Sequence, residues 1–198
     1  MSRFNTLIYK IDAVNSSDPN RIQYAGSEIA KELLYSMRMT DELAAFRPEA
    51  SEQLQIAARA QHIERWTSPR AAYPEGRTGY KKWRAQLMLF HTNRTGELMA
   101  EAGYPEDDIK RVKYLIQKRA MSKDEETQAL EDVICLVFIK HYLQEFASEH
   151  PREKIVDIIQ KTWKKMSSKA QAKALTINLA EDVSQLVQDA LSNTNKNI

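Results

Sequence analysis

Hydrophobic residues recur every three or four positions along most of this chain, which is the spacing of an amphipathic α-helix. The pattern predicts a first helix that ends in the polar stretch 15–19 and a second helix capped by Ser27. A third helix is expected to open at Pro48 and to have His62 near its end. We find no segment with the period of two that a β-strand shows, so we expect helices to form the whole fold.

The second half of the chain has the same period with clearer boundaries. A long helix is predicted to follow the loop up to residue 79 and to stop at Gly103, and Pro105 is predicted to begin the next helix. A capping-box pattern at 122–125 precedes the most apolar helix, which is expected over about 123–148. Pro151 opens another helix, weaker helical segments run to Leu191, and residues 192–198 are expected to fray. The sequence therefore predicts one all-α domain over 1–198 with about eight helices.

Composition narrows the class of protein without identifying its function. The 198 residues, 42% of them hydrophobic, suffice for one core, and the net charge of +2 gives no global preference for nucleic acid or membranes. The single cysteine, Cys135, lies in an apolar run, as expected of a buried thiol in a reducing compartment. We recognise no signal peptide and no apolar run long enough to span a membrane, so we expect a cytoplasmic protein. The sequence gives no indication of the oligomeric state.

Two acidic residues, Glu131 and Asp132, directly precede an apolar run at 133–139 that we expect to lie inside the protein. A buried carboxylate is costly unless it is paired, hydrogen-bonded or bound to a metal ion. One interpretation of Asp132 is a buried ion pair with an arginine from the segment around His62, or a hydrogen bond to a histidine. A second is a metal ligand or a catalytic acid–base group, and a third is an exposed side chain without a role. All three interpretations stay open at this point.

Two histidines lie at the edge of the expected core. His62 is near the end of its predicted helix, and His91 lies halfway along the long helix. Each is also compatible with a half-buried structural histidine. Together with Asp132 they offer three ligands from three helices, and a catalytic divalent metal needs such a set with one position left for water. The sequence thus suggests one divalent ion (Mn, Fe, Co, Ni or Zn) held by His62, His91 and Asp132, with His62, Asp132 and Glu131 as catalytic residues.

The segment 59–84 combines cationic and aromatic residues in a loop interrupted by Pro and Gly. Seven Lys or Arg residues occur there against two Glu, with Trp and Tyr between them. One guanidinium group can donate two hydrogen bonds to a phosphate group, and a flat aromatic ring can stack on a base. The segment therefore predicts a site for a small anionic ligand, either phosphorylated or nucleotide-like. The predicted substrate-binding residues are Arg65, Trp66, Arg70, Tyr80, Trp83 and Arg84.

The same segment also has a purely structural interpretation. Trp66 and Trp83 can be core residues, and the arginines can pair with acids such as Glu131 and Asp132. Nucleic-acid binding ranks below both interpretations, because it usually needs a wider basic surface. The second lysine cluster, at 161–173, is more typical of the solvated side of a terminal helix.

Several short motifs lie along nearly the whole chain. They are Ile11-Asp12, Asn15, Asp18-Pro19, Gln61-His62-Ile63-Glu64-Arg65-Trp66, Pro69-Arg70, Tyr73-Pro74, Gly79-Tyr80, Trp83-Arg84 and Gln128-Ala129-Leu130-Glu131-Asp132-Val133. In these motifs the chain resembles an uncharacterised family, domain of unknown function 4202. That resemblance implies no established activity.

More distantly, the order His62, His91, Asp132 resembles that of HD-type metal-dependent phosphohydrolases, in which a helix ending in His-Asp precedes further histidines and a late aspartate. This resemblance implies an HD-like helical fold and a bound metal ion. Ile63 stands where the aspartate of the His-Asp pair is expected, which implies a one-metal site or a metal-free remnant used for binding. The leading hypothesis is a metal-dependent phosphohydrolase that acts on a small phosphorylated or nucleotide-like substrate. The alternative is a non-catalytic module that binds an anionic metabolite or nucleotide through the segment 59–84. An RNA- or protein-interaction domain ranks third.

Overall fold

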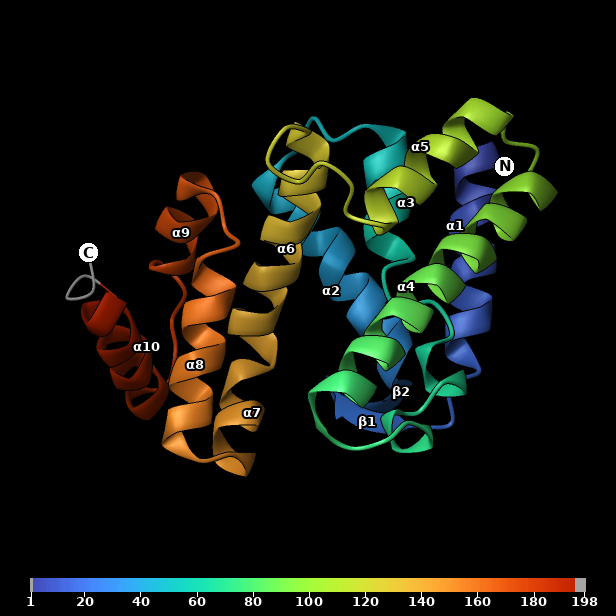
Figure 1. Cartoon of the computed structure of the whole chain (residues 1–198). Helices are drawn as coiled ribbons and strands as arrows, with labels where there is room; N and C mark the ends of the chain where they lie inside the picture. Colours follow the sequence, from blue (N-terminus) through green and yellow to red (C-terminus); the bar gives the residue numbers. More distant parts are fainter. Residues whose placement is uncertain (1, 195–198) are drawn as a thin grey trace. The chain divides into compact units, whose positions relative to one another are not determined.

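A computed structural model describes residues 2–194 and shows a helical protein (Figure 1). Contacts between Cα atoms divide the chain into two compact units, residues 1–130 and 131–198. Helices account for 71% of the structure and strands for 4%, which confirms the predicted all-α class. A single domain over 1–198 and an HD-like arrangement of the helices stay predictions. Among the residues described, no helix is both long enough and apolar enough to cross a membrane.

The first unit consists of packed helices and one short hairpin. Its elements are α1 (Arg3–Ser16), β1 (Arg21–Tyr24), β2 (Ser27–Ala30), α2 (Lys31–Phe46), α3 (Glu52–Arg59), the 3-10 helices η1 (Arg65–Thr67) and η2 (Arg70–Ala72), α4 (Gly76–Glu101), α5 (Glu106–Ile116) and the beginning of α6 (Glu125–His141). Helix α4 packs against α5, α3 packs against α2 and α5, and α1 contacts α2, α3 and α4 (Figure 1). Apolar side chains fill the space between these helices, among them Leu7, Ile11, Met39, Leu54 and Ile116.

The hairpin corrects the prediction that Ser27 caps a helix. Strands β1 and β2 pair antiparallel, and both turn residues between them, Ala25 and Gly26, have the positive φ angles that short hairpin turns favour. Helix α2 starts only after β2, and Asp18 Oδ2 accepts a hydrogen bond from the Glu32 backbone N–H at 3.1 Å. Four residues per strand are too few to show a period of two, so the sequence pattern did not reveal the strands.

Two other helices start after a side chain that accepts a backbone hydrogen bond. Helix α3 does not open at Pro48 but follows Ser51, whose Oγ accepts from the N–H three residues further on at 3.1 Å. Helix α6 follows Asp124, whose Oδ1 accepts from the Thr127 N–H at 2.8 Å, and Ser122 of the predicted capping box lies before that start. The carboxylate and hydroxyl acceptors therefore fix both helix starts a few residues later than predicted.

The end of α4 agrees with the prediction. Gly103 has a φ of +79°, and the Tyr104 N–H reaches back to the carbonyl oxygen of Met99 at 3.0 Å. This arrangement is the Schellman motif, and it favours glycine because a Cβ atom is disfavoured in left-handed backbone.

The described part of the second unit continues α6 and adds α7 (Leu143–Glu149), α8 (Arg152–Trp163), α9 (Ser168–Ala174) and α10 (Glu181–Thr194). Helix α8 follows Pro151, as predicted, and packs against α7 and α10. The single helix predicted for 123–148 is interrupted at Tyr142, whose φ is −128°. Helix α10 runs to Thr194, within the stretch expected to fray, and residues 195–198 lie outside the described residues.

Asp132 is buried in the second unit and anchors the start of α9. Its Oδ1 accepts a hydrogen bond from the Ser167 backbone N–H at 2.8 Å, and its Oδ2 accepts one from the Ser167 hydroxyl at 2.5 Å. Ser167 is itself the N-cap of α9 and accepts from the Ala170 N–H. Hydrogen bonds to a carboxylate are stronger than neutral ones, so this pair offsets part of the cost of burying Asp132.

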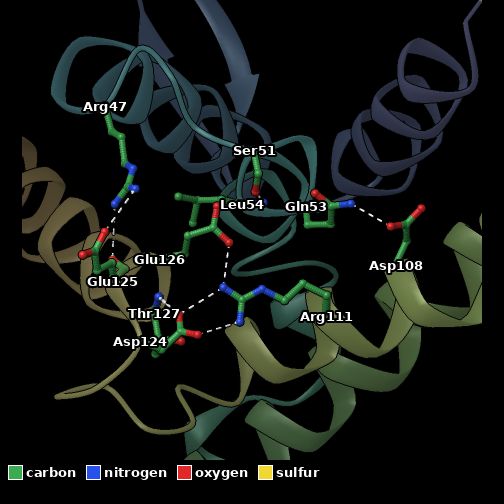
Figure 2. A network of polar contacts seen from close by, with 10 residues as sticks. All are labelled: Arg47, Ser51, Gln53, Leu54, Asp108, Arg111, Asp124, Glu125, Glu126 and Thr127. Carbon is green, nitrogen blue, oxygen red and sulfur yellow. Dashed lines mark hydrogen bonds and ion pairs between the residues drawn. The ribbon is translucent and has the colours of Figure 1, made fainter.

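A polar network joins the starts of α3 and α6 to α5 within the first unit (Figure 2). The Arg111 guanidinium donates to both carboxylate oxygens of Asp124, at 2.7 and 3.1 Å, and to Glu126 at 2.6 Å. Nearby, the Gln53 amide donates to Asp108 at 2.7 Å. The hydrogen bonds from Arg111 lower the pKa of Asp124 to about 2.

We predict that Asp124→Asn lowers the unfolding free energy at neutral pH by roughly 1–2 kcal/mol, because the ion pair with Arg111 is lost. The pKa of Asp124 is lower in the folded state than in the unfolded chain. Its stabilisation is therefore complete above about pH 4 and is lost as the pH falls toward 2. Urea unfolding at several pH values should show the difference between variant and wild type shrinking in that window. Asp107→Asn, which changes an exposed i,i+3 pair, is the matched control and should be neutral. A pH-independent difference for Asp124→Asn would contradict this account.

We also predict that Asp132→Ala lowers the unfolding free energy by about 1–3 kcal/mol, because the half-buried Ser167 N–H and hydroxyl lose their acceptors. Thermal unfolding followed by circular dichroism measures the effect. Asp157→Ala removes an exposed carboxylate of the same unit and should change little. Equal stability of the Asp132 variant and the wild type would show that the hydrogen bonds between Asp132 and Ser167 do not stabilise the fold.

Candidate functional site

The site is built on the chain reversal that follows α3. Glu64 in this turn has a φ of +49°, which is uncommon for a residue other than glycine. Its backbone N–H donates to the Asn15 side-chain oxygen at 3.0 Å, and its carboxylate accepts from Arg94 at 2.5 Å. Asn15 is fully buried, and its amide nitrogen donates to the Ser36 hydroxyl at 2.8 Å. Contacts from α1, α2 and α4 thus hold the turn in its conformation.

A pocket of about 220 Å³ opens between this turn, one face of α4 and the end of α5, all within the first unit. The residues from α4 stand at positions 84, 85, 87, 88 and 91, which recur with the period of a helix and so project from one side of it. Four apolar side chains line the pocket together with six polar or charged ones. The polar and charged residues are Gln61, His62, Arg65, Arg84, His91 and Lys118. The wall therefore carries three cationic side chains and no carboxylate.

His62 is held on three sides. Its ring stacks on Tyr35 with the centroids 3.8 Å apart, and its Nδ1 lies 3.3 Å from a carboxylate oxygen of Glu32. A guanidinium nitrogen of Arg65 lies 3.2 and 3.3 Å from the two ring nitrogens. Burial lowers the pKa of His62 well below its usual value, and the positive charge of Arg65 adds to that shift. The imidazole is therefore neutral and fixed in orientation.

Glu32 is the acidic residue beside the pocket, and it was not among the predicted site residues. It lies on the buried face of α2, and burial raises the pKa of its carboxyl to about 7, although the charge of Arg65 opposes this. Its sequence signal is similar to that of Asp132, namely an acidic side chain on a helix face that is largely apolar. Applied to α2, that argument would have found Glu32.

His91 faces the same pocket with its protonation pattern determined by the backbone. Its Nδ1 lies 2.8 Å from the carbonyl oxygen of Ile63. A carbonyl oxygen can only accept, so Nδ1 carries the hydrogen and Nε2 carries the lone pair. Burial lowers the pKa of His91 to about 3, with a further contribution from His62, so the ring is neutral. The two imidazole centroids lie 6.1 Å apart.

The cations of the pocket differ in how they are held. The Arg65 guanidinium lies 5.3 Å from the centre of the Trp83 ring, in addition to its contact with His62. Arg84 is exposed, and no ion pair or hydrogen bond joins it to another residue in the part of the chain that the structure describes. A guanidinium without a protein partner is available to an anionic ligand.

Lys118 lines the pocket from the residue position just beyond α5. Its φ is +54°, and its N–H donates to the Leu115 carbonyl at 2.9 Å, while the Arg119 N–H reaches Tyr114 at 3.3 Å. The end of α5 is thus a Schellman motif with lysine where glycine is usual. In the sequence, Lys118 has the appearance of one more basic residue complementing a helix dipole, so it was not predicted as a site residue.

The predicted loop arginine, Arg70, has a structural role. Its guanidinium donates to the backbone carbonyls of Tyr73 and Pro74, at 2.9 Å each, and so closes its own loop. The loop lies directly on α4, where a Cβ atom at Gly79 would stand 1.8 Å from the Pro74 oxygen. Arg70 therefore stabilises the loop and does not line the pocket.

The predicted aromatic residues lie outside the pocket lining. Trp83 is only 7% exposed, and its indole N–H donates to the Ser68 carbonyl at 2.9 Å, as the core interpretation expected. Trp66 is half-buried in η1. Tyr80 is 49% exposed, and its ring centroid lies 5.8 Å from that of Trp83. Of these three predicted rings, Tyr80 is the most accessible to a ligand from solvent.

The structure thus brings His62, His91, Arg65 and Arg84 to one pocket. Glu131 and Asp132 lie in the second unit, where Lys165 is 3.4 Å from Glu131 and Ser167 binds Asp132. Across the described residues, no group of three or more His, Cys, Asp or Glu side chains is arranged to hold a metal ion. Metal binding by His62, His91 and Asp132 stays a prediction.

Comparison with known proteins gives one result. No curated protein and no solved structure matches the chain. The family model described as a domain of unknown function (DUF4202) matches residues 5–187, a range that includes every residue of the pocket. The motifs around His62 and Asp132 suggested this family, and the chain belongs to it.

Proposed function

We propose that the first unit binds a small phosphate-bearing anion in the pocket between α4, α5 and the turn after α3. The observation that carries the proposal is the set of three cations, Arg65, Arg84 and Lys118, on a wall without a carboxylate. Guanidinium and ammonium groups match the charge and hydrogen-bonding geometry of phosphate oxygens. The volume of about 220 Å³ is smaller than that of pockets for drug-sized ligands, which favours a small metabolite.

The two histidines form a neutral part of the pocket wall. His62 and His91 add no charge of their own, and their orientations are fixed by Glu32 and the Ile63 carbonyl. Side chains that are already fixed lose little conformational entropy when a ligand arrives. The non-catalytic binding module is therefore the function that the pocket supports best.

We predict that Arg84→Gln weakens binding of inorganic phosphate or pyrophosphate about tenfold or more, because one charge-assisted contact is lost. Isothermal titration calorimetry in the presence of EDTA measures the affinity. The ligand-free variant should melt at the same temperature as the wild type or higher, since Arg84 has no described partner and repels the other two cations.

Lys82→Gln is the matched control for this measurement. It removes the same charge from an exposed position on α4 that does not line the pocket, and it should leave the affinity unchanged. Equal weakening by both variants would mean that net charge, and not the pocket, attracts the anion. Failure of the wild type to bind either anion would refute the proposal.

Metal-dependent hydrolysis of the bound phosphate compound is the second candidate function. It is favoured by two imidazoles on one wall, with Glu32 3.3 Å from His62. Elemental analysis after growth with Mn, Fe, Co, Ni and Zn tests for the metal, and phosphate release from p-nitrophenyl phosphate tests for turnover. His62→Ala protein, which lacks one imidazole, is the reference for both measurements.

A further inference from the structure

The feature of the pocket that anion binding leaves unused is the free lone pair of His91. Its Nδ1 hydrogen is committed to the Ile63 carbonyl oxygen, 2.8 Å away. No hydrogen bond to its Nε2 is found among the residues that the structure describes. His91 is only 4% exposed, and the rings of Phe90 and His62 stand beside it, at 5.7 and 6.1 Å. The imidazole is therefore immobilised with its nucleophilic nitrogen unpaired.

The surroundings of His91 suit a reaction at phosphorus. Arg65, Arg84 and Lys118 line the same pocket and would withdraw charge from phosphate oxygens. Each cation can also stabilise a leaving group that departs with negative charge. An unprotonated imidazole next to a phosphate-binding cluster has the two components that covalent phosphoryl transfer needs.

We propose that Nε2 of His91 accepts a phosphoryl group from a bound donor and forms phosphohistidine. This inference rests on the proposed anion-binding function. The donor class is a phosphoanhydride, whose leaving group departs as a phosphate anion, or a phosphoramidate that is already protonated on nitrogen, whose leaving group departs as neutral ammonia or amine. The Nε2–P bond forms as the bond from phosphorus to the leaving group breaks, and the leaving group keeps the electron pair of that bond.

The hydrogen on Nδ1 stays in place throughout this step. The phosphorylated ring carries a positive charge, which the Ile63 carbonyl oxygen stabilises through the existing hydrogen bond. His62, which contacts Glu32, lies beside His91 and makes no bond to phosphorus in this scheme. The carbonyl of Ile63 is thus the positioning group for the nucleophile.

Phosphoramidate is the probe that tests the proposal, because it phosphorylates accessible imidazoles without an enzyme. Intact-protein mass spectrometry at alkaline pH, followed by peptide mapping, should place one phosphoryl group on His91. We expect labelling there to be roughly tenfold faster than at the other histidines, since binding in the pocket brings the reagent close to Nε2. His141 and His150 in the same chain are internal controls for uncatalysed labelling.

His91→Asn is the decisive variant, because its amide nitrogen is bonded to Cγ, as Nδ1 of histidine is, and can still donate to the Ile63 carbonyl while no nucleophilic nitrogen remains. We expect it to lose the label while it still binds inorganic phosphate, because Arg65, Arg84 and Lys118 remain in the pocket. The inference would be overturned if the wild type bound phosphate but His91 were not labelled, if all histidines were labelled equally, or if His62 were labelled instead. Each of these results would still be compatible with the binding function. If the wild type did not bind phosphate at all, the binding function itself would be refuted.

Discussion

The buried amide of Asn15 is the connection on which the geometry of the pocket depends. Its oxygen binds the backbone N–H of Glu64, and its nitrogen binds Ser36 of α2, so one side chain of α1 ties two other segments together. The left-handed backbone of Glu64 costs on the order of 1 kcal/mol, and it persists because the surrounding structure compensates that cost. The Ile63 carbonyl and the His62 ring belong to this same turn. A change in the turn would therefore move both histidine environments at once.

Two arginines of the first unit show how differently the same side chain is used. Arg111 donates to Asp124 and Glu126 in a closed network, and those hydrogen bonds raise its pKa further. Arg84 has no described partner, and it lines the pocket together with two other cations, Arg65 and Lys118. The first arrangement lowers the free energy of the folded chain, and the second raises it slightly through like-charge repulsion. Arg84 is therefore available to an external anion, as the proposed binding function requires.

The sequence predicted the class of the fold better than its boundaries. Helical periodicity identified nearly every helix. The hairpin of β1 and β2 was not predicted, because strands of four residues are too short to show a period of two. The pocket was predicted in part, since His62, Arg65, Arg84 and His91 were all named from their local sequence. The contribution of Lys118 depends on where α5 ends in space, and periodicity gives helix ends only to within a few residues.

The burial argument applied to Asp132 was correct about its environment, but the partners suggested with it, an arginine near His62 or a histidine, did not include Ser167. Asp132 is buried, but the group that satisfies it is Ser167, which lies 35 residues further along the chain. A pattern of apolar positions shows that a carboxylate is enclosed, and it contains no information on which donor faces that carboxylate. The same argument would have found Glu32, whose contact with His62 likewise joins distant segments. Sequence reasoning of this kind locates candidates, and the three-dimensional pairing decides their roles.

The ends of α4 and α5 provide the last argument for a site in this pocket. Both helices end in a Schellman motif, and the left-handed residue is Gly103 in one case and Lys118 in the other. Glycine adopts this backbone freely, whereas a residue with a Cβ atom pays roughly 1 kcal/mol. At Gly103 the favourable residue is present, and no side chain is needed. At Lys118 the chain accepts the cost and gains an ammonium group on the pocket wall. In the proposed binding function, this ammonium group is the third cation of the pocket, together with Arg65 and Arg84.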